Sequence, residues 1–123
     1  MKINKPLLVL FCILMIVKTI LSLFIISPTI FSDEYIHLKL ARSFYYTSTF
    51  NVHNIPIISH PLYIIIISLA NVFTNPFIIY FITKLINVIL SSLIIFPAFY
   101  LAKEFFDNKK SFFIALIIAI FSA

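Results

Sequence analysis

The sequence has no glycine, no tryptophan and a single cysteine, Cys12, among its 123 residues. Without glycine the chain cannot form the glycine-rich loops that cradle nucleotide phosphates, because those loops need bare backbone at fixed positions. One cysteine cannot form a disulfide within the chain, and an apolar run around Cys12 predicts that it is a small buried hydrophobe. These absences exclude phosphate-loop nucleotide binding and a disulfide-stapled scaffold.

Charged residues are also scarce, at 11% of the chain, whereas 63% is hydrophobic and the mean hydropathy is +1.15. A soluble domain usually has about 25% charged residues, which help to cover its wet surface. The net charge of +5 is spread along the chain, which favours orientation and lipid contact over nucleic-acid binding. The composition therefore predicts an integral membrane protein with no nucleic-acid partner.

Two apolar runs, 7–27 and 77–102, are long enough to cross a bilayer as helices, since about 20 residues suffice. The first run is too long for a signal peptide and lacks a cleavage site, so we expect an uncleaved anchor. Lys2 and Lys5 predict a cytoplasmic N-terminus. The two runs together predict a multi-pass protein of the cell membrane. Lys18 lies in mid-span, where a cation must face protein or a polar cavity, and it suggests further helices that cover it.

The segment 28–60 is predicted to be an outer loop that carries a surface helix over 33–46. Ser32 is a good N-cap, and Asp33 and Glu34 follow in the first turn, where the helix dipole favours acids. Helical spacing places Asp33, His37, Ala41 and Phe44 along one side of this helix. The residues from 47 to 55 are expected to form a polar loop.

The remaining apolar runs are shorter. The run 61–73 is predicted to be interfacial or re-entrant, because about 10–14 residues seldom span, and a short transmembrane helix is the alternative. Its shallow placement puts the lysine-rich segment 103–110 in a cytoplasmic turn, as the positive-inside rule prefers. The run 111–123 is a truncated last span. The expected fold is thus one all-α membrane module with two full transmembrane helices.

Five short motifs follow one another along the chain. They are Asp33-Glu34, Ala41-Arg42, His60-Pro61-Leu62-Tyr63, Lys84-Leu85 and Leu101-Ala102-Lys103-Glu104-Phe105-Phe106. Together they resemble the N-terminal part of the GT-C membrane glycosyltransferases, in particular the protein mannosyltransferase and aminoarabinose transferase group. The resemblance covers most of the chain, and the Asp-Glu pair in the first outer loop is its most specific motif.

The resemblance implies transfer of a sugar from a polyprenyl-phosphate carrier to a hydroxyl on the outer face of the membrane. Asp33 would then be the general base, with Glu34 supporting it, and Lys84 or Arg42 would bind the phosphate. No cofactor or metal is implied. His37, His53 and His60 with Asp33 have no recognised metal-ligand spacing.

Each of these residues also has a structural interpretation. Asp33 and Glu34 are common helix-start residues, Arg42 suits lipid headgroups, and Lys84 lies within snorkelling distance of the interface.

The family's enzymes carry more spans and a second outer acid, so the resemblance implies a truncated or remnant module that needs membrane helices from another chain. A small membrane interaction protein or a transporter fragment is the alternative. Whether the chain is an enzyme stays open at this point.

Overall fold

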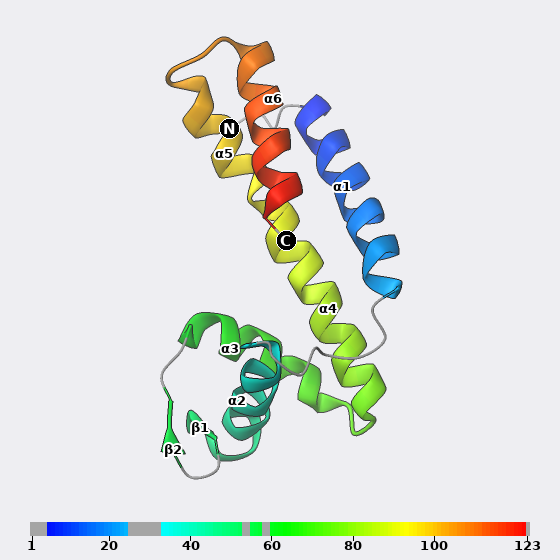
Figure 1. The fold of residues 1–123 in the computed structure, drawn as a ribbon, viewed down its shortest axis with the longest axis vertical. Helices are drawn as coiled ribbons and strands as arrows, with labels where there is room; N and C mark the ends of the chain where they lie inside the picture. Colours follow the sequence, from blue (N-terminus) through cyan, green and yellow to red (C-terminus); the bar gives the residue numbers. More distant parts are fainter. Residues whose placement is uncertain (1–4, 25–32, 53–54, 58–59, 123) are drawn as a thin grey trace. The chain divides into compact units, whose positions relative to one another are not determined.

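The computed structural model describes residues 5–24, 33–52, 55–57 and 60–122. The chain is mostly helical, as predicted (Figure 1). Its helices are α1 (Lys5–Leu23), α2 (Asp33–Thr47), α3 (Pro61–Ser68), the 3₁₀ helix η1 (Leu69–Val72), α4 (Pro76–Leu93), α5 (Ile95–Lys103) and α6 (Asn108–Phe121). Inside the expected loop 47–55, β1 (Asn51–Val52) begins a short antiparallel ladder with β2 (Ile55–Pro56).

The chain divides into two compact units, and the division falls within α4. The first unit comprises residues 1–24 and 87–123, and the second comprises residues 25–86.

Two helices are long and apolar enough to cross a membrane, Lys5–Leu23 and Pro76–Lys103. They match the predicted spans 7–27 and 77–102, except that residues 25–27 lie outside the described part of the chain. The second helix has 28 residues and is interrupted at Ile94, where α4 ends and α5 begins. Pro97 explains the interruption, because it has no N–H to donate to the carbonyl of Leu93.

In the first unit, α1 packs through residues that recur at helical spacing. Leu7 and Leu14 are buried, Phe11 packs beside them, and its ring centroid lies 5.4 Å from that of Phe96. Cys12 lies on a different side of α1 and is exposed, so its predicted burial is wrong. The apolar run covers several sides of α1, whereas only one of these sides packs against other helices of the unit.

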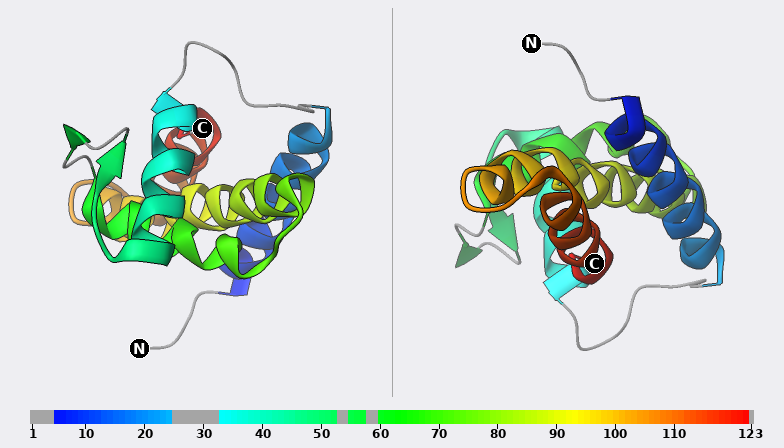
Figure 2. Two further views of the ribbon diagram at one scale, coloured as in Figure 1. Left: turned by 90° about the horizontal axis from the view of Figure 1, so that it is seen from below. Right: turned by 90° about the horizontal axis from the view of Figure 1, so that it is seen from above.

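Helices α5 and α6 form an antiparallel hairpin and lie side by side (Figure 1, Figure 2). The buried residues of α6 are all small, namely Ser111, Ala115 and Ala119, whereas α5 buries Ile95 and Phe99 beside Ala98 and Ala102. Small residues four apart let two helices approach closely, as in membrane helix pairs. The connection is shorter than the predicted turn 103–110, since α5 extends to Lys103 and α6 already begins at Asn108.

Lys18 continues the packed side of α1, four residues beyond Leu14. Its Nζ donates hydrogen bonds to Ser91 Oγ at 3.0 Å and to Ser122 Oγ at 3.3 Å. The Ser122 hydroxyl in turn donates to the carbonyl oxygen of Ser91 at 3.0 Å. The expected polar environment of Lys18 is therefore present, but the chain itself supplies it. Lys18 consequently gives no indication of additional helices, contrary to the sequence argument.

In the second unit, α2 packs on α3. Leu40 and Ala41 are fully buried against Ile64 and Ile67. Phe44 continues this side of α2 and stacks on Phe50, with ring centroids 4.9 Å apart. Ala41 and Phe44, which helical spacing places on one side of the helix, therefore both lie on the side that packs.

The run predicted at 61–73 forms α3 and η1 together, Pro61–Val72, and is shorter than a membrane-spanning helix. Pro61 stands at the first helical position, which suits its fixed φ and its missing N–H. Leu62, Ile65, Leu69 and Val72 remain exposed along the side that does not face α2. This segment is therefore apolar on both sides, one packed and one uncovered.

Candidate functional site

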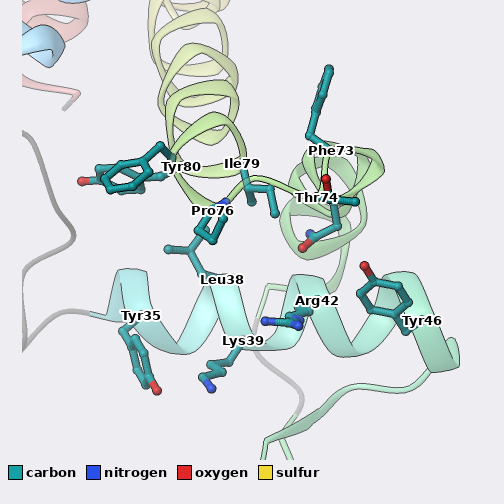
Figure 3. A pocket seen from close by; sticks show the side chains of 12 residues that line it. Tyr35, Leu38, Lys39, Arg42, Tyr46, Phe73, Thr74, Pro76, Ile79 and Tyr80 are labelled. Carbon is teal, nitrogen blue, oxygen red and sulfur yellow. The ribbon is translucent and has the colours of Figure 1, made fainter.

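The second unit contains a cavity of about 430 Å³ between α2 and the segment that runs from η1 into α4 (Figure 3). It is lined by Tyr35, Leu38, Lys39, Arg42, Tyr46, Asn71, Phe73, Thr74, Pro76, Phe77, Ile79 and Tyr80. Most of the lining is apolar, and the described lining includes two cationic side chains but no acidic one.

One wall of the cavity is a single face of α2. Its residues stand at positions 35, 38, 39, 42 and 46, a spacing that brings side chains to one side of a helix. In Figure 3 Leu38 points toward Pro76, whereas Tyr35 and Lys39 extend away from it at the rim. Lys39 Nζ lies 5.4 Å from the centre of the Tyr35 ring, a cation–π contact. Arg42 lies across this face, between Lys39 and Tyr46 (Figure 3).

The opposite wall is fixed by the start of α4. Asn75 Oδ1 accepts a hydrogen bond from the backbone N–H of Phe77 at 2.9 Å, and Pro76 occupies the first helical position. An asparagine cap followed by proline is a favourable way to begin a helix. Phe77, which is 76% exposed, and Phe73 add apolar side chains to this wall.

Tyr80 joins the cavity to the charged residues around it. Its hydroxyl is buried and makes no well-formed hydrogen bond within the described residues, although the Glu34 carboxylate is near enough to interact with it electrostatically. Lys84 follows one turn later on α4, with its Nζ 5.0 Å from the centre of the Tyr80 ring. Tyr80 is thus a shared neighbour of an acid and a base.

The structure places the predicted site residues as follows. Asp33 is the first residue of α2, but its side chain lies outside the described part of the structure. Glu34 and Lys84 both approach Tyr80, and Arg42 lines the cavity to which Tyr80 also belongs. Their proposed chemical roles stay predictions.

Sequence reasoning missed Tyr80 and Lys39. A recognisable signal was present, because a tyrosine precedes a lysine by four residues at both Tyr35–Lys39 and Tyr80–Lys84. On a helix this spacing places the ammonium group near the ring. Such a repeat identifies residues that contact each other, but not the cavity that they border.

The histidines make aromatic contacts. The His37 ring packs edge-on against His60 at 5.5 Å and against Tyr63 at 5.2 Å between centroids. His53 lies outside the described residues. Within the residues that are described, no three His, Cys, Asp or Glu side chains gather where they could hold a metal ion.

Comparisons with protein-family models, with curated proteins and with solved structures find no match to this chain.

Proposed function

We propose that the protein is a membrane module that binds a polyprenyl-phosphate-linked sugar in the cavity of the second unit. The observation that carries the proposal is the pairing in one cavity of Arg42 and Lys39 with a mostly apolar lining. A polyprenyl phosphate has the same two parts, an anionic head and a long apolar chain.

Arg42 is the best-placed group for the phosphate. A guanidinium offers a planar fork of donors that matches phosphate oxygens, and it stays charged at any physiological pH. Lys39 at the rim adds positive charge that attracts an anionic head during approach. Phe73 and Phe77 would contact the apolar chain.

A membrane location is supported by the two long apolar helices and by the uncovered side of α3 and η1. A short helix that is apolar all round needs an apolar medium on its free side. We therefore place this segment in the interfacial layer of the outer leaflet, with the cavity at the water–lipid boundary.

In the proposed reaction the acceptor hydroxyl oxygen bonds to the anomeric carbon as the bond from that carbon to the phosphate oxygen breaks. The hydroxyl proton moves to the carboxylate of Asp33, which acts as general base. Arg42, with Lys84, stabilises the charge on the departing lipid phosphate. Glu34, beside Tyr80, supports the acceptor, and helices from a partner chain complete the groove for the lipid.

Binding can be tested with a tryptophan reporter, because the natural chain has none. Phe77→Trp protein in zwitterionic nanodiscs would be titrated with geranylgeranyl monophosphate and, separately, with geranylgeraniol. We expect the phosphate to bind more tightly than the alcohol. Arg42→Gln should weaken phosphate binding about 10-fold or more, since a hydrogen bond to a charged group contributes about 1.5–3 kcal/mol.

Lys103→Gln is the matched control, because Lys103 is an exposed cation of the first unit. It should leave the affinity unchanged. Equal affinities for phosphate and alcohol, or an unchanged affinity in Arg42→Gln, would contradict the proposed phosphate site.

A further inference from the structure

A second cavity, of about 370 Å³, lies at the turn end of the α5–α6 hairpin in the first unit. It is lined by Phe106, Lys109, Lys110, Phe113 and Ile114. We propose that this cavity binds an anionic phospholipid of the surrounding bilayer, with its phosphate on the two lysines and its acyl chains along the two phenylalanines. The site is separate from the polyprenyl-phosphate cavity and does not depend on sugar transfer.

The lining residues are left uncovered by the way in which α6 packs. Ser111 and Ala115 are fully buried, so they define the side of α6 that faces the protein. The Ser111 hydroxyl also donates to the carbonyl oxygen of Asp107 at 2.9 Å, which fixes the first turn of the helix. Phe113 lies on another side and is 64% exposed. The aromatic side chain and the neighbouring lysines therefore face outward together.

The charges at this end allow an anion to bind. Lys110 Nζ lies 3.7 Å from Asp107 Oδ1, but both side chains are well exposed, and such pairs are weak. Lys109 forms no ion pair within the described part of the chain. Glu104 and Asp107 are the acidic side chains of the turn, and Lys103 adds a further cation to it.

The two lysines make the cavity selective for a lipid whose headgroup is negatively charged. A lysine near an anionic bilayer surface favours binding by about 1 kcal/mol, whereas a zwitterionic headgroup brings its own cation to the same place. The acids of the turn offset part of this preference. We expect the site to prefer an anionic lipid to a zwitterionic one by about 3- to 10-fold.

The test uses Phe113→Trp as the sole tryptophan, in the full-length protein reconstituted into an equimolar mixture of phosphatidylglycerol and phosphatidylcholine. Only one of the two lipids carries brominated acyl chains in each sample, and bromine quenches the indole on contact. The proposal expects stronger quenching from brominated phosphatidylglycerol. Adding Lys109→Gln and Lys110→Gln should bring the two samples to equal quenching.

Ile117→Trp is the matched control, because Ile117 is exposed one turn farther along α6 and away from the lysines. It should be quenched equally by both lipids. Asp107→Asn in the Phe113→Trp protein should increase the preference, since it removes the competing carboxylate and keeps a good N-cap residue.

Equal quenching of Phe113→Trp by the two lipids would overturn the proposal. So would a preference that survives the loss of both lysines, or one that Ile117→Trp shows to the same degree. The absence of quenching in both tryptophan variants would show that α6 does not contact lipid, and it would overturn the membrane placement as well. A negative result in the geranylgeranyl monophosphate titration would contradict the polyprenyl-phosphate cavity but would not contradict this phospholipid site.

Discussion

In the first unit the half-buried Lys18 donates to two serine hydroxyls of the same unit, whereas in the second unit Arg42 borders an open cavity. Both are cations beside apolar surface, and Lys18 has two serine hydroxyls that hold its ammonium group. The buried face of the α5–α6 pair in the first unit combines alanine and serine with the larger Ile95 and Phe99, which fill the space between the helices. In the second unit, aromatic side chains instead line an open cavity.

This difference separates a structural cation from a candidate binding cation. A charge whose donors have protein acceptors contributes to packing, and a charge at the edge of a mostly apolar cavity is placed to contact a ligand.

The largest effect is expected for Asp33→Asn in the second unit. Asparagine suits a helix start as well as aspartate does, so folding and insertion should be retained. An amide cannot accept the proton of the acceptor hydroxyl, and sugar transfer should fall by about 10²-fold or more. Transfer from a polyprenyl-phosphate sugar would be measured in a reconstituted complex, with Glu34→Gln expected to be milder. Unchanged transfer in both variants would mean that the two acids only begin the helix.

The next prediction concerns the sides of the membrane on which the two units have exposed residues. In a Cys12→Ser background, a cysteine at Asn51 should react with an impermeant maleimide in intact cells. A cysteine at Asn108 should react only after the membrane is opened, because the lysines of the turn favour the cytoplasmic side. Equal labelling at both positions in intact cells would instead require that Pro61–Val72 crosses the bilayer.

The smallest effect is expected within the first unit, at the contact between Lys18 and Ser91. Lys18→Leu should weaken the association of α1 with α4 and α6, because a hydrogen-bonded contact is replaced by a side chain that packs equally well against lipid. A double-mutant cycle with Ser91→Ala should give a coupling of about 0.6 kcal/mol, the average for membrane helices. Unfolding in mixed micelles would measure it. A coupling of zero, or a gain in stability in Lys18→Leu, would show that the hydrogen bond between Lys18 and Ser91 does not stabilise the packing of α1.

Much of the helical layout was predictable, because it follows from the lengths of the apolar runs and from proline positions. Pro61 and Pro76 both stand at helix starts, where proline is favoured. The sequence also indicated correctly that Lys18 must have a polar neighbour, since a lone cation in mid-span is costly. It did not reveal which residues would supply that neighbour.

The cavities were not predictable in the same way. Arg42 and Tyr80 stand far apart in the sequence, and they line one cavity because α2 contacts η1, which leads into the start of α4. Helical spacing reports which residues share a face, but it does not report which face meets another segment. The exposure of Cys12 was missed for a related reason, since an apolar run in a membrane-type helix does not specify which side packs against protein.

For the proposed membrane location, the interruption of the long helix at Ile94 bears on the range of bilayer thickness that the protein can span. A continuous helix of 28 residues would be about 42 Å long, against a hydrocarbon core of about 30 Å. Fitting it as one straight rod would require a tilt of about 45°, beyond the usual range for membrane helices. Because Pro97 divides the helix into two shorter rods, each can take its own tilt. We therefore expect the protein to accommodate both thin and thick membranes without exposing apolar helix ends to water.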